Sequence, residues 1–232
     1  MLNFSNLNLI GIKNFPCIKI KLSFKIIFQA TISGVIAWFF KNNYKDILCW
    51  FWKMKELEDL ILTYKDFPKK GIDFKDVLGI IQEPEVFKKL ILKMSSSTII
   101  KNCETIISID ARGFIFGSAI SLQASKPMVV ARKPGKLPGD IIKQNYNLEY
   151  GESSLSIQKS VLGKYDSFAV VDDLLATGGT VNCVSNLLKN NGKEVSGLIT
   201  VVELTKLKGR SKFKFPVESV ITFWNIKNYF LK

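Results

Sequence analysis

The chain has 232 residues, a formal net charge of +13 and a hydrophobic fraction of 47%, values that indicate a folded protein with a sizeable core and not a disordered chain. It contains no histidine, which excludes a Ser-His-Asp triad, a Cys-His dyad and any zinc site with histidine ligands. Its four cysteines form no CxxC pair, which favours a reducing compartment, so we expect a cytoplasmic protein without a disulfide framework.

Residues 1–53 differ in composition from the rest of the chain. They hold seven lysines but a single acid, and residues 26–40, IIFQATISGVIAWFF, form a run of 15 residues without a charge. A membrane-spanning helix needs roughly 20 apolar residues, so we expect no stable membrane insertion. We interpret 1–53 as a basic, apolar N-terminal extension of doubtful function and 54–232 as the functional domain. Whether the extension is retained, directs the protein to a target or packs as a structural piece stays open.

The sequence from Met54 onwards predicts helices that alternate with strands. Apolar residues at helical spacing predict a helix over 54–64, and a turn-rich segment follows over 67–76. Acids and Pro84 then begin a second helix. The other expected elements are, in chain order, a strand over 105–110, a helix within 111–123, a strand over 126–132, a hairpin around Gly151, a strand over 167–172, a helix after Gly179 and strands over 197–203 and 218–223.

This alternation predicts an α/β fold with a mostly parallel twisted sheet flanked by helices. Ligands of such sheets bind beyond the carboxyl ends of the strands. Three of the expected strands end at Asp110, at Arg132 and at the pair Asp172–Asp173. Because parallel strands run in one direction, we expect these charged side chains along a single edge of the sheet.

The stretch FAVVDDLLATGGT, residues 168–180, is the most informative motif. Two adjacent carboxylates at the end of a buried strand can accept hydrogen bonds from the vicinal hydroxyls of a ribose, so we assign Asp172 and Asp173 to ribose binding. The small residues that follow let backbone N–H groups approach a phosphate, and the next helix adds the positive end of its dipole. We therefore expect the 5′-phosphate of the sugar to be bound by Ala176, Thr177, Gly178, Gly179 and Thr180.

This motif resembles the phosphoribosyl-pyrophosphate (PRPP) signature of the type I phosphoribosyltransferases, and LLATGGT is most similar to the adenine phosphoribosyltransferases. Three further stretches agree in order, namely 67–76, 110–121 and 132–159, and VVELTKLKGR (201–210) is similar to a late strand of the family. The resemblance covers the chain from about Met54 to its end. It implies purine salvage, in which adenine and PRPP give AMP and pyrophosphate. It also implies Mg²⁺ bound with PRPP, no metal ligand assigned directly in the chain, a homodimer, a small N-terminal hood and a flexible hairpin loop.

The resemblance implies that two basic segments bind pyrophosphate. One is the DARG turn, where Ala111 and Arg112 would hold it and where a non-proline cis peptide is expected between Asp110 and Ala111. The other is the loop after the strand 126–132, which would close over the substrate and exclude water. In that loop Arg132, Lys133 and Lys136 would face the pyrophosphate, with Arg132 and Lys136 acting in catalysis.

The remaining site residues also rest on the resemblance. Glu149 is the candidate general acid/base near N7 of the base, which is chemically reasonable in a chain without histidine, and Tyr150 would lie over the pyrophosphate and sugar. Phe74 would stack on the purine, backbone groups near Lys75 would read its amine edge, and Leu204 would complete the base site.

Two other functions remain open on the sequence. A relative acting on xanthine, hypoxanthine or guanine would need a donor to the 6-keto group, and spacing alone locates none. A PRPP-sensing regulator without catalysis would use the +13 charge on nucleic acid. We interpret the basic stretch 206–214 as a solvated rim and expect no nucleic-acid partner, because it has few aromatic residues for stacking on bases.

Overall fold

The structure, a computed structural model, describes residues 57–148 and 151–224. All of them belong to one of the two units into which the chain divides, Met54–Lys232. Glu149 and Tyr150, the acid and the aromatic residue expected on the hairpin, lie outside the described residues. The fold is therefore described here for that unit alone.

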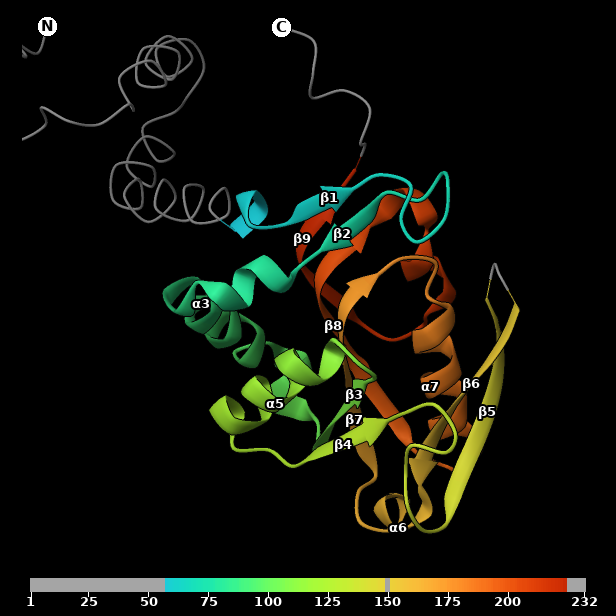
Figure 1. Cartoon of the computed structure of the whole chain (residues 1–232). Helices are drawn as coiled ribbons and strands as arrows, with labels where there is room; N and C mark the ends of the chain where they lie inside the picture. Colours follow the sequence, from blue (N-terminus) through green and yellow to red (C-terminus); the bar gives the residue numbers. More distant parts are fainter. Residues whose placement is uncertain (1–56, 149–150, 225–232) are drawn as a thin grey trace, which may run out of the picture. The chain divides into compact units, whose positions relative to one another are not determined.

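A parallel sheet of five strands forms the centre of this unit, in the order β4-β3-β7-β8-β9 (Figure 1). The sequence alternation thus gives the predicted α/β architecture. All these strands run in the same direction, so their carboxyl ends meet at one edge. Their bounds are Thr105–Ile109 for β3, Met128–Ala131 for β4, Ser167–Leu175 for β7, Glu194–Leu204 for β8 and Val217–Phe223 for β9.

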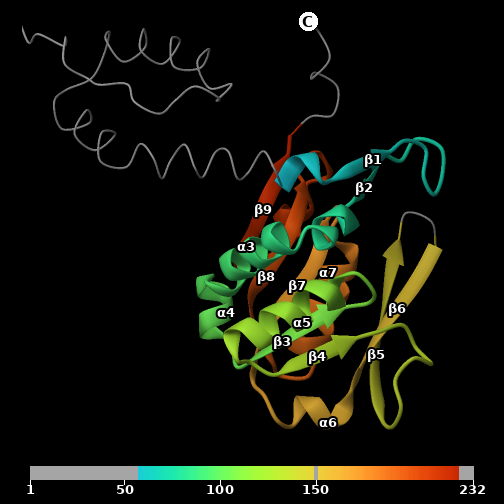
Figure 2. The ribbon, with the colours of Figure 1, turned by 60° about the vertical axis from the view of Figure 1, so that its left-hand side comes forward.

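Helices cover one face of the sheet and a helix with a hairpin covers the other (Figures 1 and 2). The first face carries α3 (Pro84–Ser95), α4 (Thr98–Asn102) and α5 (Gly113–Ala124), and the second carries α7 (Gly179–Asn190) with β5 (Ile141–Leu148) and β6 (Gly151–Gln158). The thiol of Cys183 on α7 donates to the carbonyl of Gln144 on β5 at 3.1 Å. Hairpin and helix therefore pack as one layer.

The buried run FAVV explains why β7 lies at the centre. Val171 packs into the core beneath α5, whereas Val170 packs into the core beneath α7. A strand covered on both faces needs apolar residues on both sides, so it reads as a continuous hydrophobic run. The apolar stripe predicted for α7 is confirmed, because Val181, Val184, Leu187 and Leu188 are all buried.

A small antiparallel pair, β1 (Leu62–Tyr64) and β2 (Phe74–Asp76), forms the hood. The helix predicted over 54–64 is wrong at 62–64, since helix ends before β1 begins. Pairing with β2 overrides the helical spacing of the apolar residues, a common outcome for short segments. The turn-rich reading of 67–76 likewise missed β2.

Five short helical elements were not predicted. They are η1 (Leu78–Gln82), α4 (Thr98–Asn102), α6 (Lys159–Leu162), η2 (Thr205–Leu207) and η3 (Gly209–Lys212). Each has five residues or fewer, too few for a periodic pattern to be detected. Among the residues that the structure describes, no helix has the length and apolar character needed to cross a bilayer.

Candidate active site

The expected edge of charged residues is confirmed at the carboxyl ends of β3, β4 and β7. The register places Ile109 beside Ala131 and Ser108 beside Val171. The residues that follow these strands are therefore neighbours. Arg132 Nε donates to Asp110 Oδ2 at 3.0 Å, which joins the ends of β4 and β3.

The acids assigned to the ribose are buried within β7. Asp172 is 8% exposed and Asp173 is 5% exposed. The predicted end of this strand at residue 172 is wrong, because β7 continues to Leu175 through its pairing with β8. Burial, and then the neighbouring charge of Asp173, raise the pKa of Asp172 well above 3.8. Two adjacent buried carboxyl groups are costly without hydrogen-bond donors, and the hydroxyls of a sugar are donors of a suitable kind.

Arg112 joins the hood to the buried acids. Its Nε lies 2.6 Å from Asp173 Oδ2 in an ion pair. The contact lacks the geometry of a hydrogen bond, so this buried oxygen has no hydrogen-bond partner among the described residues. The same guanidinium lies 4.8 Å from the centre of the Phe74 ring. The predicted pyrophosphate cation is thus in contact with a predicted ribose acid and a predicted base-stacking ring.

The turn that carries Arg112 has the geometry implied by the resemblance. The peptide bond between Asp110 and Ala111 is cis. Gly113, the first residue of α5, lies so close to β7 that a Cβ there would be 3.0 Å from Asp172 Oδ1 and 3.1 Å from the carbonyl oxygen of Val171. A bare backbone at 113 therefore lets α5 begin directly beside the acids.

The loop 176–180 connects β7 to α7. Gly178 has φ +76° and is the residue before the first turn of the helix, a conformation that glycine adopts without strain. No side chain caps this helix N-terminus. Helix α7 has twelve residues and directs the positive end of its dipole towards the loop. This arrangement favours the binding of a phosphate.

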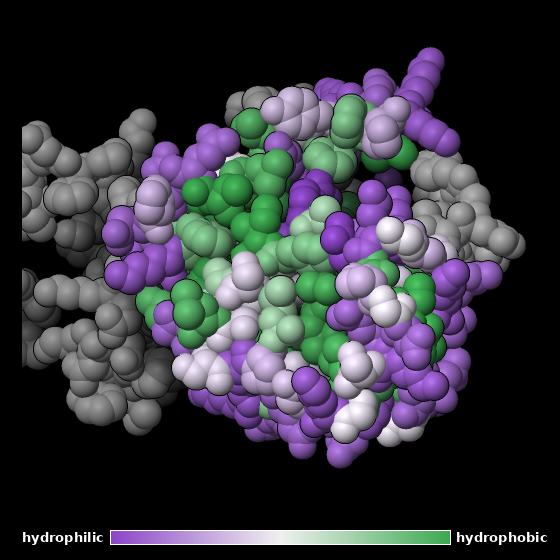
Figure 3. Space-filling model, turned by 60° about the horizontal axis from the view of Figure 1, so that its bottom comes forward, coloured by the Kyte–Doolittle hydropathy of each residue, from purple (hydrophilic) through white to green (hydrophobic). Residues whose placement is uncertain are grey.

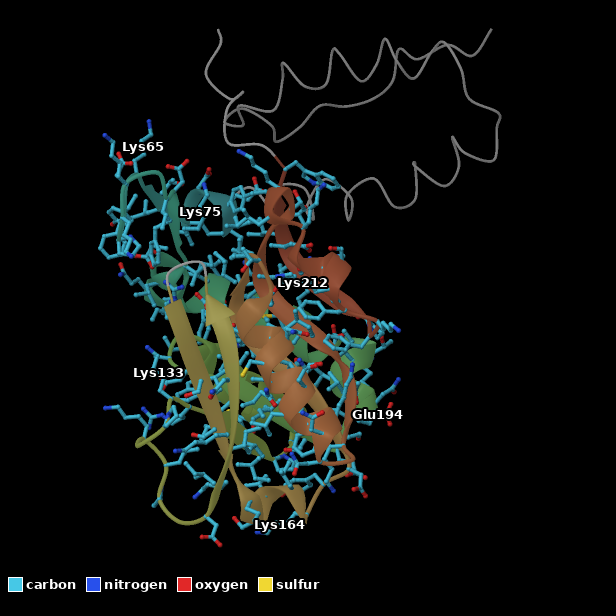
Figure 4. All side chains as sticks on the ribbon, turned by 90° about the vertical axis from the view of Figure 1, so that its right-hand side faces the viewer. Lys65, Lys75, Lys133, Lys164, Glu194 and Lys212 are labelled. Carbon is cyan, nitrogen blue, oxygen red and sulfur yellow. The ribbon has the colours of Figure 1, made fainter. Side chains whose placement is uncertain are left out.

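The basic loop after β4 exposes two of its three predicted cations. Arg132 is anchored by two backbone bonds with Ser156, at 3.0 and 2.7 Å, and by Asp110. Lys133 and Lys136 are exposed, and Figure 4 shows Lys133 beside the hairpin strands. The structure thus places one cation at the sheet edge and leaves the two lysines on the surface.

The predicted base residues come from the hood and from β8. Phe74 is half-buried and meets Phe67 edge to face at 5.2 Å. The side chain of Lys75 is used inside the hood, where its Nζ donates to Thr63 Oγ1 at 2.7 Å and lies 4.4 Å from the centre of the Phe223 ring. The side chain of Lys75 therefore has its partners within the described part of the fold, and the reading of the purine by the backbone near Lys75 stays a prediction. Leu204 ends β8 and is half-buried.

Comparisons with known proteins agree with this geometry. The phosphoribosyl transferase domain family matches residues 81–229. An adenine phosphoribosyltransferase of Prochlorococcus marinus (strain MIT 9515) is 76% identical over 168 residues, which are 72% of this chain and 98% of that protein. This chain belongs to the adenine phosphoribosyltransferase family.

Solved structures support the same assignment. The crystal structure of adenine phosphoribosyltransferase from Thermoanaerobacter pseudethanolicus matches with a TM-score of 0.70 and 37% identity, covering 73% of this chain and 99% of that one. The Saccharomyces cerevisiae enzyme, solved with adenine and an imino-altritol bisphosphate, matches with a TM-score of 0.66 and 33% identity, covering 72% and 98%. The five-stranded sheet is that of an adenine phosphoribosyltransferase.

Sequence reasoning missed an ion pair at the end of β8 of this adenine phosphoribosyltransferase. Glu203 is 4% exposed, and Arg210 Nε donates to its Oε1 at 3.0 Å. The stretch 206–214 was interpreted as a solvated basic rim, but Arg210 turns back to the sheet. A buried acid followed seven residues later by arginine was the only available signal, and such spacing is common on surfaces.

Proposed function

We propose that this chain transfers the 5-phosphoribosyl group of PRPP to N9 of adenine, giving AMP and pyrophosphate. The bond between C1′ and the pyrophosphate oxygen breaks, the bond between C1′ and N9 forms, and the imidazole proton of adenine passes to a general base, for which Glu149 near N7 is the candidate. The observation that carries this assignment is the joining of Asp172, Asp173 and the loop 176–180 in one strand-to-helix connection, with Arg112 in contact with the acids.

The chain's own groups suit the charges of this reaction. Negative charge grows on the leaving pyrophosphate, and preorganised cations stabilise it best where water is excluded. Arg112 and Arg132 are held at the sheet edge by Asp173 and Asp110. Lys133 and Lys136 are exposed on a loop, so they are suited to reach the pyrophosphate after the loop closes. Arg132 and Lys136 are the proposed catalytic cations, and Ala111 and Tyr150 the further pyrophosphate contacts.

The ribose and base would bind on opposite sides of Arg112. Asp172 and Asp173 would accept the 2′ and 3′ hydroxyls, and residues Ala176 to Thr180 would hold the 5′-phosphate. Phe74 would stack on adenine, with the backbone at Lys75 and the side chain of Leu204 completing the site. Since Arg112 contacts both Asp173 and Phe74, its guanidinium would turn away from them to contact the pyrophosphate group of bound PRPP.

Mg²⁺ would be bound together with PRPP. The ion commonly uses one or two carboxylates together with substrate phosphates. The described residues contain no group of three or more His, Cys, Asp and Glu that could hold a metal, while Asp172 and Asp173 provide paired carboxylates at the sheet edge. This donor set fits an ion carried by the substrate, which would neutralise charge on the departing pyrophosphate.

The proposed homodimer has a suitable surface on the side of α3 and α5. A groove of about 400 Å³ there is lined by apolar residues that include Phe87, Ile91 and Leu122. The side chain of Leu122 is 84% exposed, and hydrophobic groups gather on that side of the molecule (Figure 3). A second copy of the chain would remove these groups from water.

The domain boundary and the location are also proposals. We place the functional domain at 54–232, a boundary supported by relatives that are matched over nearly their whole length by less than three quarters of this chain. A cytoplasmic location accords with Cys103 and Cys183, which are buried free thiols among the described residues.

A spectrophotometric assay with PRPP and each purine base tests the function. Adenine should be converted and hypoxanthine, guanine and xanthine should not. Turnover of a 6-keto base in preference to adenine would favour the rival transferase. No turnover of any base, together with salt-sensitive binding of DNA or RNA, would favour the regulator.

Glu149→Gln tests the proposed general acid/base. The variant should lower kcat by about 100-fold or more, in the range typical of general acid/base catalysis, while the KM values for adenine and PRPP change little. Steady-state kinetics at saturating substrates measures both parameters, with Glu152→Gln as the control on the same hairpin. An unchanged kcat would reject the role of Glu149.

A further inference from the structure

A turn after β8 lies directly against the outer side of the loop 176–180. A Cβ added to Gly209 would be 2.2 Å from the carbonyl oxygen of Ala176 and 3.1 Å from the backbone nitrogen of Gly178. From the other side, a Cβ on Gly178 would be 2.9 Å from Cζ of Phe213 and 3.0 Å from the carbonyl oxygen of Gly209. The turn 209–213 and the loop therefore touch backbone to backbone.

Arg210 fixes this turn to the sheet. Its guanidinium pairs with both carboxylate oxygens of Glu203 on β8 and donates to the carbonyl of Val217, the first residue of β9. Ser219 Oγ on β9 donates to Glu203 Oε2 at 2.9 Å, and it lies 3.1 Å from Thr200 Oγ1. One side chain thus connects the turn to two strands, and Lys212, labelled in Figure 4, lies in the same turn.

We propose that Arg210 and Gly209 are positioning residues for the phosphate loop 176–180, with Arg210 clamping the turn to Glu203 and Val217 and Gly209 setting its distance from Ala176 and Gly178. This rests on the proposed binding of the 5′-phosphate by that loop. Bound phosphate needs several backbone N–H groups aimed at one point, so a shift of a few tenths of an ångström in the loop weakens its affinity.

A purely structural role of Arg210 and Gly209 would have different consequences from a positioning role. It would change stability and all ligands alike, whereas a positioning role changes ligands that carry the 5′-phosphate and leaves adenine little affected. The discriminating quantities are the Kd of ribose 5-phosphate and of AMP, measured by calorimetry, and the KM for adenine at saturating PRPP.

Gly209→Ala is the primary variant, because it adds one methyl group and no charge. It should raise the Kd of ribose 5-phosphate and of AMP by about tenfold, the loss expected for one charge-assisted hydrogen bond. The KM for adenine should stay within about twofold of the parent value. Gly163→Ala is the matched control, since a Cβ there meets only the carbonyl oxygen of Ser160 at 3.9 Å. Its ligand constants should equal those of the parent.

The double variant Glu203→Gln/Arg210→Met removes the clamp without leaving a buried charge, and it should reproduce the selective loss. Lys212→Met is its control from the same turn. Equal losses for adenine and ribose 5-phosphate, or lower thermal stability with unchanged ligand constants, would overturn the positioning role.

Thr180→Val separates this inference from the phosphate assignment itself. Weaker ribose 5-phosphate binding in Thr180→Val, combined with parental binding in Gly209→Ala and in the double variant, rejects the positioning role alone. Parental binding in Thr180→Val as well would count against the proposed phosphate loop.

Discussion

Two neighbouring strands carry buried acids that are treated in opposite ways. On β7, Asp172 lies beside the charge of Asp173, and Asp173 Oδ2 forms an ion pair with Arg112 but no hydrogen bond among the described residues. Glu203 on β8 instead accepts hydrogen bonds from Arg210 and Ser219. Burial raises the pKa of Asp172, but hydrogen bonding from Arg210 lowers the pKa of Glu203. The three acids are similarly buried, with exposed fractions of 8% for Asp172, 5% for Asp173 and 4% for Glu203. The difference teaches that the acids proposed to bind ribose include a buried oxygen without a hydrogen-bond partner among the described residues, whereas the fully paired acid holds the turn after β8.

The largest effect is expected when the charges of the two acids on β7 are removed. Asp172→Asn combined with Asp173→Asn should raise the KM for PRPP by about 100-fold, because two charge-assisted hydrogen bonds to ribose hydroxyls become neutral ones. Initial rates with PRPP varied measure this. Asp166→Asn, an acid whose side chain is 85% exposed, should behave like the parent. Unchanged KM in the double variant would remove these acids from the ribose site.

A smaller effect is expected when the partner of Glu203 is removed. Arg210→Met should lower the free energy of unfolding by about 2 kcal/mol, less than the usual cost of breaking a buried pair because this arginine is only half-buried. The melting temperature should fall by about 4–8 °C. Urea and thermal unfolding measure both quantities.

Glu203→Gln added to Arg210→Met should restore part of that loss, since no buried charge then lacks a partner. A double variant as unstable as the single one would show that packing around Arg210, not its charge, stabilises the turn.

The smallest effects sharpen the comparison through their opposite dependence on pH. Between 3.8 and its raised pKa, Asp172 binds more protons when folded, so stability should decrease as pH rises through that range. Glu203 has a pKa below 4.5 when folded, so its contribution is complete above pH 4.5 and is lost as pH falls through the lowered pKa.

Urea unfolding at a series of pH values should separate the two groups. Asp172→Asn should remove the decrease above pH 3.8, and Glu203→Gln should weaken the loss at acidic pH. The same pH dependence in parent and Asp172→Asn would mean that Asp172 does not titrate in this way.

The parts of the site that are continuous in sequence were predictable. The residues 168–180 contain the strand, the acids, the loop and the helix start in a single run, so local composition was enough to place them. The contact of Arg112 with Phe74 and the pairing of Arg132 with Asp110 join segments far apart in sequence. The resemblance implied roles for Arg112 and Phe74, and the ends of the expected strands indicated Asp110 and Arg132. Neither showed these contacts, which depend on how the chain folds.

Short segments show the same limit. Leu62–Tyr64 have helical spacing with the residues before them, yet they pair with Phe74–Asp76. Arg210 was interpreted as part of a solvated rim because the stretch 206–214 has few aromatic residues for stacking on bases. Nothing local distinguishes it, and only the approach of β8 and β9 provides Glu203 and the carbonyl of Val217.

The bare contact between Gly178 and Gly209 has an evolutionary consequence. Because main chain meets main chain there, with a carbon added to Gly209 3.1 Å from the nitrogen of Gly178 and one added to Gly178 3.0 Å from the carbonyl oxygen of Gly209, no graded series of side chains can tune the spacing. Substitutions at the two positions are expected to show strong epistasis, in which the tolerance of one site depends on its counterpart remaining glycine. Laboratory drift of this gene should therefore retain glycine at one or both of the two positions.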